Sequence, residues 1–251
     1  MSELHPATRG FSAADVYERG RPGYPDAAVA AIVDRLGLRS GRTVLDLAAG
    51  TGKLTRLLVP SGANVLAVEP VPEMRAELER HVRRVAVLAG TAERIPLTDA
   101  YVDAVTVGQA FHWFDPDTAL REIHRVLVPG GGLALIWNVR DERDPLHAAL
   151  SEIIDPLEGA TPRRRSRDWR ALLEESPLFE QTERQLFEHV QEADAQGVVD
   201  RVTSISFIAS APADVRARVE RRVRALVADA TPPIRLPYMT ELFVSVAASG
   251  P

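Results

Sequence analysis

An apolar run that gives way to two closely spaced glycines stands out at Thr43-Val-Leu-Asp-Leu-Ala-Ala-Gly-Thr-Gly-Lys53. Residues 43–47 are typical of a buried strand, and Gly50 and Gly52 allow a tight turn that a ligand can approach closely. A helix is expected from about Lys53 to Leu58. Amide groups at such a turn and at the start of the next helix lack partners within the helix, so the stretch predicts a cradle for a nucleotide-like ligand at a sheet edge.

The composition is that of an ordinary soluble globular protein. The chain has 251 residues, of which 45% are hydrophobic and 26% charged, enough to bury a sizeable core. The absence of cysteine excludes disulfides, a thiol nucleophile and a thiolate-bound metal. A net charge of −5 argues against a dedicated nucleic-acid surface. Because no apolar run could span a bilayer and residues 1–20 lack the apolar core of a signal peptide, we expect a cytoplasmic location without membrane attachment.

Strand and helix patterns alternate on the C-terminal side of the glycine turn. Apolar strands are expected at residues 63–68, 85–88, 101–107 and 133–139, with helices at 72–82 and 115–127. Asp115 is a suitable N-cap for the second of these helices, and the glycines of Pro129-Gly-Gly-Gly132 are expected to end it. The alternation predicts a doubly wound α/β fold with a mostly parallel sheet. Strands at 181–190 and 239–247 would complete a seven-stranded sheet.

The flanking segments are predicted to be mostly helical. A helix at 26–36 follows Arg21-Pro-Gly-Tyr-Pro25, and amphipathic helices are expected at 144–157, 167–175 and 212–229, the last with Pro212 at its first helical position. Residues 198–209 would form part of a helical lid. The arginine-rich run at 163–167 fits a solvated linker, with attraction of an acidic acceptor as the alternative. We therefore expect an N-terminal cap and ligand-binding core at 1–140, and a helical lid with the last strands of the same sheet at 141–251.

Polar and aromatic side chains follow the expected strands, where open α/β sheets hold their ligands. Glu69 ends a strand at the spacing from Gly50 at which such folds present an acid to a ribose. The stretch Gly108-Gln-Ala-Phe-His-Trp-Phe114 brings three aromatic residues and a histidine to another strand end. The alternative interpretations are a solvated acid and aromatic core packing.

In the order and spacing of these motifs, the chain resembles the class I S-adenosylmethionine-dependent methyltransferases, specifically the small-molecule branch that includes trans-aconitate and quinone-biosynthesis methyltransferases. The match is good over residues 10–140 and loose beyond. Asp46-Leu-Ala-Ala-Gly-Thr-Gly52 resembles the first motif of the family, Glu69 its ribose acid, Gly90-Thr-Ala-Glu-Arg-Ile-Pro96 its adenine-side loop, and Leu127-Val-Pro-Gly-Gly131 its lead-in to strand five. Arg21-Pro-Gly-Tyr-Pro25 and Gln109-Ala-Phe-His-Trp113 are similar to narrower signatures of the trans-aconitate-like branch.

The resemblance implies S-adenosyl-L-methionine as cofactor and a set of residues around it. The expected cofactor-binding residues are Tyr17, Arg21, Asp46, Ala48, Gly50, Gly52, Glu69, Pro70, Val71, Met74, Thr91, Ala92, Glu93, Gly108, Gln109 and Ala110. The expected acceptor-side residues are Tyr24, His112, Trp113, Phe114 and Trp137. A cationic sulfonium and amino group favour an acidic strand end, whereas a pyrophosphate favours a helix N-terminus without carboxylates. A nicotinamide-dependent dehydrogenase is the weaker alternative, because Thr55 stands at the third glycine of G-x-G-x-x-G.

Methyl transfer from a sulfonium is an in-line displacement, so the enzyme must align nucleophile, carbon and sulfur and exclude water. An ionised carboxylate acceptor needs no base, but a phenol, hydroxyl or amine does. His112 is the best candidate for that base, with packing beside Trp113 as the alternative, and Tyr17 is a second catalytic candidate. Arg21 could pair with a carboxylate of cofactor or substrate. The six histidines show no metal-ligand spacing, so no metal is expected.

Three functions are consistent with these residues. The favoured one is a methyltransferase that acts on the O, N or C nucleophile of a small molecule. A nucleic-acid or protein methyltransferase is less favoured, because no Asn-Pro-Pro-Tyr-like or cysteine motif occurs. The third is an S-adenosylmethionine-binding protein whose chemistry has been lost or exchanged. The residues predict neither the identity of the acceptor nor an oligomeric state.

Overall fold

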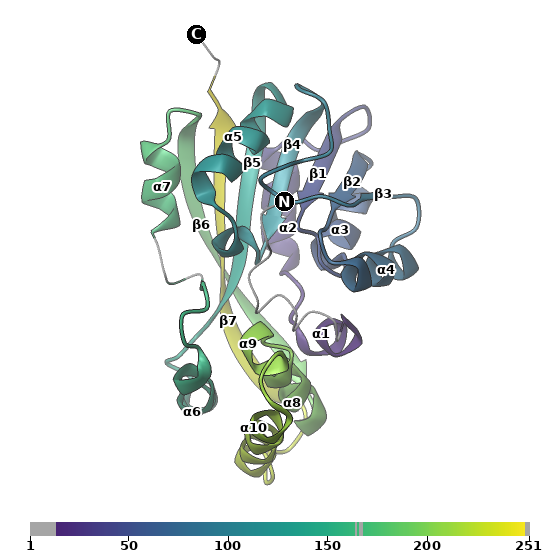
Figure 1. Ribbon diagram of the computed structural model, residues 1–251. Helices are drawn as coiled ribbons and strands as arrows, with labels where there is room; N and C mark the ends of the chain where they lie inside the picture. Colours follow the sequence, from purple (N-terminus) through teal and green to yellow (C-terminus); the bar gives the residue numbers. More distant parts are fainter. Residues whose placement is uncertain (1–13, 164, 166–167, 249–251) are drawn as a thin grey trace. The chain divides into compact units, whose positions relative to one another are not determined.

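The computed structural model describes residues 14–163, 165 and 168–248 (Figure 1). Within these residues the chain forms two compact units. The larger comprises 24–138, 162–187 and 240–248, and the smaller comprises 14–23, 139–161 and 188–239. Arg164, Ser166 and Arg167 of the arginine-rich run lie outside the described residues. The division predicted at residue 140 stays a prediction.

Seven strands form one sheet. They are β1 (Thr43–Leu47), β2 (Asn64–Val68), β3 (Ala86–Leu88), β4 (Val102–Gly108), β5 (Leu127–Arg140), β6 (Phe179–Ala193) and β7 (Ile234–Ala247), in the order β3-β2-β1-β4-β5-β7-β6 (Figure 1). The pairs β1–β2, β1–β4, β2–β3 and β4–β5 are parallel. The prediction of a doubly wound, mostly parallel seven-stranded sheet is confirmed. The strand order reverses between β1 and β4, which is where such folds bind ligands.

Helices flank the sheet in the larger unit (Figure 1). They are α2 (Asp26–Arg35), α3 (Lys53–Leu58), α4 (Pro72–His81), α5 (Pro116–Val126) and α7 (Trp169–Glu175), with short 3₁₀ turns η2 (Val59–Ser61) and η3 (Phe111–Trp113). The side chains of Val44, Leu45 and Leu47 on β1 are fully buried. This buried strand, in which Asp46 is the one charged residue, follows from the parallel arrangement, in which helices cover both faces of the sheet.

The smaller unit is largely helical. It contains α1 (Ala14–Gly20), α6 (Pro145–Ile154), η4 (Asp155–Leu157), α8 (Ala195–Thr203), α9 (Ser206–Ala209) and α10 (Ala213–Leu226), and it includes the segments of β6 and β7 at 188–193 and 234–239. Its apolar core includes Leu150, Val198 and Val202. The sequence pattern did not predict α1. Gly20, at its end, lies so close to α8 that a Cβ atom would come within 2.4 Å of the Asp200 carbonyl oxygen.

One helix boundary and one capping contact differ from those expected. Pro212 is the N-cap of α10 rather than its first residue. Asp115 does occupy the N-cap position of α5, but its carboxylate accepts from the Thr118 hydroxyl at 2.5 Å and caps no backbone amide. The short hydroxyl side chain of Thr118 reaches the acid and takes the place of the amides.

The glycines of Pro129-Gly-Gly-Gly132 do not end α5, which is the third difference. The helix ends at Val126, and Leu127 already pairs with Val102 in β5; the register then shifts, so that Ala104 pairs with Gly132. The proline and glycines therefore form an irregularity inside a strand, because proline cannot donate to the ladder and glycine tolerates close backbone approach. A Cβ at Gly131 would lie 2.9 Å from the Val128 carbonyl oxygen.

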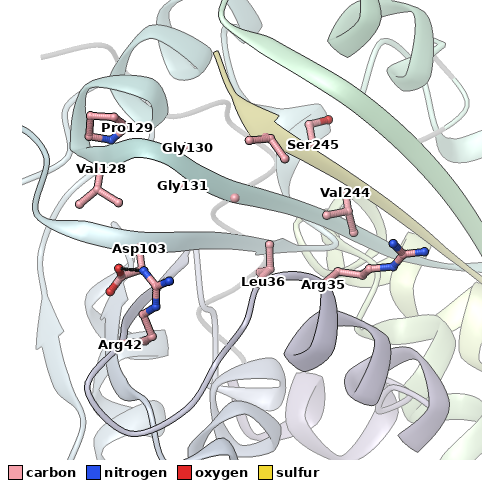
Figure 2. A pocket seen from close by; sticks show the side chains of 12 residues that line it. Arg35, Leu36, Arg42, Asp103, Val128, Pro129, Gly130, Gly131, Val244 and Ser245 are labelled. Atoms are coloured by element: carbon pink, nitrogen blue, oxygen red, sulfur yellow. Dashed lines mark hydrogen bonds and ion pairs between the residues drawn. The ribbon is translucent and has the colours of Figure 1, made fainter. Parts of the chain in front are cut away.

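A small pocket of about 170 Å³ lies beside this irregularity (Figure 2). Arg35, Arg42 and Asp103 contribute its charged groups. Arg42 pairs with Asp103 and Arg35 with Glu183, so each of these cations is already neutralised. The pocket lies at the starts of β1 and β4, the opposite ends of these strands from the edge at which a ligand is predicted to bind.

Candidate active site

The carboxyl ends of β1, β2 and β4 lie side by side. Leu47 pairs with Val68, and Asp46 pairs with both Ala67 and Thr106. The segments that follow these strands therefore meet at one edge of the sheet. They contain the glycine turn, Glu69 and the aromatic stretch that ends β4, as the sequence predicted.

Asp46 is buried within this edge and is 1% exposed. One carboxylate oxygen accepts from the Thr55 hydroxyl at 2.6 Å and the other from the Thr106 hydroxyl at 3.2 Å. Burial raises the pKa of Asp46 to about 7, and the two hydroxyl donors only partly offset it. Asp46 thus joins β1 to α3 and β4, while its direct contact with a cofactor stays a prediction.

Glu69 is held by the backbone of two neighbouring segments. Its Oε2 accepts from the Gly50 amide and its Oε1 from the Val71 amide, each at 2.9 Å. Arg75 donates to the carbonyl oxygens of Glu69 and Pro70, at 2.7 and 2.8 Å. Burial raises the pKa of the Glu69 carboxyl. Since a carboxylate oxygen can accept two hydrogen bonds, each oxygen retains capacity for a hydroxyl group of a ligand.

The two glycines of the turn have different environments. Gly50 has a φ of +57°, and a Cβ there would meet no described atom within 4 Å. Gly52 has a φ of +83°, and a Cβ there would lie 2.9 Å from Leu78 and 3.0 Å from Val82. Gly50 therefore opens to space that a ligand can fill, whereas Gly52 allows close packing of the turn.

Two non-glycine residues at this edge have left-handed backbone conformations. Ala48, after β1, has a φ of +56°, and Gln109, after β4, has a φ of +60°. Side chains disfavour this region, and such strain clusters where a ligand or active site imposes it. Both residues are among the predicted cofactor contacts. The Gln109 amide donates to the Ile136 carbonyl at 2.8 Å, which holds the turn after β4 to β5.

The predicted adenine-side residues lie on α4 and in the loop after β3. Val71 is the N-cap of α4, and Met74 is buried on that helix. In the loop, Thr91 forms a bridge with Arg94, Ala92 is buried, and Glu93 accepts from the Asp115 amide at 3.1 Å. The loop is thus connected to the start of α5, and the contact of these residues with an adenine stays a prediction.

Aromatic side chains crowd the end of β4. A Cβ at Gly108 would lie 2.5 Å from the Tyr24 hydroxyl, so Tyr24 packs directly on this strand end. Ala110 is buried, whereas His112, Trp113 and Phe114 are half-buried. These three keep surface through which an acceptor could be reached.

Trp137 is packed more deeply than its predicted acceptor-side role suggests. It is 1% exposed, stacks on Trp169 with ring centroids 5.8 Å apart and meets Phe243 edge-on. Its Nε1 donates to Nδ1 of His112 at 3.4 Å. This hydrogen bond occupies Nδ1 of His112, so His112 can take up a proton at Nδ1 only after releasing Trp137. Trp169 was not among the predicted site residues, because no sequence motif marks its helix as a neighbour of β5.

Tyr17 and Arg21 belong to the smaller unit. The Arg21 guanidinium lies 5.0 Å from the centroid of the Tyr17 ring, and its Nη2 donates to the Ser204 carbonyl at 3.2 Å. The predicted roles of Tyr17 and Arg21 at the cofactor stay predictions.

The described residues show neither a metal-binding cluster nor a membrane-spanning helix. Across 14–163, 165 and 168–248, no three histidine, aspartate or glutamate side chains gather in a way that could hold a metal ion. In the same ranges no helix combines the length and apolar character needed to cross a bilayer.

A glycine turn, a strand-end acid and a sheet of this order define the class of Rossmann-like methyltransferases. Residues 45–135 match the model of the family described as a methyltransferase domain. Over 240 residues, or 91% of each chain, the sequence is 44% identical to an uncharacterized methyltransferase of Mycobacterium tuberculosis. The chain therefore belongs to the methyltransferase family.

Further similarities extend over parts of the chain or over the fold alone. A demethylmenaquinone methyltransferase of Beutenbergia cavernae is 41% identical over 106 residues, which is 42% of this chain and 44% of that protein. A solved structure assigned as a type II methyltransferase of Anaeromyxobacter dehalogenans superposes with a TM-score of 0.67 at 23% identity. It covers 92% of this chain and 99% of its own, and it shows the same fold.

Proposed function

We propose that the chain transfers a methyl group from S-adenosyl-L-methionine to an O, N or C nucleophile of a small molecule. The observation that carries the proposal is the Glu69 carboxylate, which two backbone amides hold beside the open face of Gly50. When bound, S-adenosyl-L-methionine supplies an electrophilic methyl group on a sulfonium. The chain's own task is to bind this donor, align the acceptor with it and exclude water.

The residues at the sheet edge fit a cationic adenosyl ligand. Asp46 and Glu69 are both buried acids whose pKa burial raises, and neither forms an ion pair with a described side chain. A positively charged ligand would stabilise their ionised forms, whereas a pyrophosphate would be repelled. Glu69 retains acceptor capacity for ribose hydroxyls. Val71, the N-cap of α4, and Met74, on that helix, would flank the adenine.

A small, ring-shaped acceptor suits the aromatic end of β4. Trp113 and Phe114 are half-buried, so they offer flat apolar surface without being sealed in the core. The relative from Beutenbergia cavernae is named for demethylmenaquinone, an acceptor with a ring. An acidic chain with a net charge of −5 is a poor match for nucleic acid, which supports a small molecule over a macromolecule.

Calorimetry with S-adenosylhomocysteine tests the proposal at Glu69. Wild type should bind, Glu69→Gln should bind more weakly, and Glu79→Gln should bind as wild type does, since the Glu79 side chain is exposed on α4. A complete lack of binding by wild type would reject the cofactor. Binding of NAD in its place would favour a dehydrogenase.

Turnover is then tested with labelled S-adenosyl-L-methionine and a panel of phenols, quinols, amines and carboxylic acids. Methyl transfer to one of them supports the proposal. Donor binding without transfer to any member of the panel would favour the alternative function, a cofactor-binding protein with lost or exchanged chemistry.

A further inference from the structure

The smaller unit contains a buried polar cluster around Tyr238. His147 on α6, His189 on β6 and Arg201 on α8 surround this tyrosine of β7. The ring centroids of His147 and His189 lie 5.0 and 6.3 Å from that of Tyr238, and the Arg201 guanidinium carbon lies 5.8 Å from it. We call these four residues the Tyr238 cluster. All belong to one unit, so their arrangement does not depend on the rest of the molecule.

Arg201 is a buried cation with unused hydrogen-bonding capacity. It is 9% exposed, and its Nε donates to the Tyr238 hydroxyl at 2.9 Å. Its Nη1 is buried and has no acceptor among the described residues. The carboxylate of the adjacent Asp200 pairs with Arg19 instead, at 3.1 Å. Burying a guanidinium without a counter-ion costs free energy, so a bound anion would stabilise the cluster by compensating the charge of Arg201.

Tyr238 acts as a hydrogen-bond donor in this cluster. Its hydroxyl donates to Gln191 Oε1 at 3.3 Å, and Gln191 Nε2 donates to the Gly20 carbonyl at 3.0 Å. This chain of neutral groups fixes the ring and the Nε side of Arg201. The Nη1 side of the guanidinium is left to bind something else.

The two histidines add neutral donors. His147 is 1% exposed, and neither of its ring nitrogens has a hydrogen-bond partner within the described part of the chain. The Pro237 carbonyl nevertheless lies close enough to favour the charged form of the ring. Nε2 of His189 is also buried without a partner. Burial lowers the pKa of both, that of His147 to about 4, where the charges of Arg201 and Arg140 contribute further. Each neutral ring keeps one N–H to donate.

We propose that the Tyr238 cluster binds the carboxylate group of a small organic acid. One guanidinium matches the single charge of a carboxylate and offers its planar donors to it, and neutral imidazoles can donate to the remaining lone pairs. A water molecule would satisfy the hydrogen bonds but leave the charge of Arg201 uncompensated. A phosphate dianion would need more positive charge, and the nearby Arg140 is already engaged with Glu142 and Asp155.

The body of the acid would lie among apolar and aromatic groups. Tyr238 is part of the same buried cluster as Leu150, Val198 and Val202. The chemistry of these neighbours therefore favours an aromatic or short aliphatic carboxylic acid as the ligand. The inference goes beyond the methyl-transfer proposal, since it requires no methyl donor and concerns the smaller unit alone.

Calorimetry on the full chain tests this site. The probes are benzoate and succinate, and the comparisons are benzamide and inorganic phosphate. Wild type should bind at least one of the two acids and should not bind benzamide. Arg201→Gln should weaken that binding roughly tenfold to a hundredfold, the usual effect of removing a charged hydrogen-bond donor. Arg218→Gln is the matched control, because Arg218 is exposed on α10 and pairs with Asp214 at 3.2 Å. This variant should bind as wild type does.

Histidine ring NMR on wild type decides the question even if Arg201→Gln does not fold. Titration with the bound acid should shift the ring signals of His147 and His189, assigned with the variants His147→Asn and His189→Asn. Unmoved signals, binding of neither acid, binding of phosphate alone, or equal affinity in folded Arg201→Gln would each overturn the proposal. S-adenosylhomocysteine binding, measured on the same sample, reports separately on the methyl-transfer proposal.

Discussion

Asp46 makes the stability of the fold depend on pH in a direction opposite to that of most acids. Burial raises its pKa from 3.8 to about 7. Between these two values the folded chain binds more protons than the unfolded chain, so the free energy of unfolding falls as pH rises from about 4 to about 7. A shift of about 3 pKa units corresponds to at most about 4 kcal/mol.

The substitution Asp46→Asn should remove this dependence. The hydroxyls of Thr55 and Thr106 can turn to accept from an amide as well as to donate to an oxygen, so the variant should lose no more than about 1–2 kcal/mol of hydrogen bonding. Relative to wild type, the variant should therefore gain stability as pH rises through this range, and the difference should level off above about pH 7.

Urea unfolding followed by circular dichroism between pH 4.5 and 8.5 measures the difference. Asp34→Asn, at an exposed position on α2, is the control for a change of net charge. If the free-energy difference between wild type and Asp46→Asn is the same at every pH, the buried carboxylate does not titrate as argued, and its place at the centre of the site must be reconsidered.

Three further predictions concern the sheet edge. Glu69→Gln should weaken S-adenosylhomocysteine binding about tenfold to a hundredfold in calorimetry, because an amide presents an N–H where the carboxylate accepts; unchanged affinity would argue against its ribose role. Gly50→Val should abolish that binding, because its side chain would fill the open face of the turn. Gly52→Ala should chiefly lower the free energy of unfolding, by roughly 1–3 kcal/mol, because its Cβ would contact Leu78 of α4 too closely. If instead Gly50→Val lowered only stability and Gly52→Ala abolished binding, the different roles given to the two glycines would be refuted. His112→Ala should lower the rate at saturating acceptor if the acceptor must lose a proton, and an unchanged rate excludes it as the base.

Local sequence patterns predicted most elements of the larger unit because their signals act over a few residues. The apolar run of β1, the glycines after it and the helix α3 lie where the sequence indicated. The failure at Pro129-Gly-Gly-Gly132 has a physical cause: the same residues can stop a helix or interrupt a strand, and pairing with β4 decides between the two.

The sequence by itself determined the alternation of strands and helices, the glycine turn, the strand-end acid and, through their order, the class of protein. Tertiary structure decided what the polar groups contact. In the folded chain the carboxylate of Asp46 accepts from two hydroxyls and that of Glu69 from two backbone amides, and the ring of Trp137 stacks on that of Trp169. Tertiary structure also gathered His147, His189 and Arg201 around Tyr238 from four separate elements. Propensity and periodicity act between neighbours in the chain, whereas burial and hydrogen-bond partners arise from segments that meet only after folding.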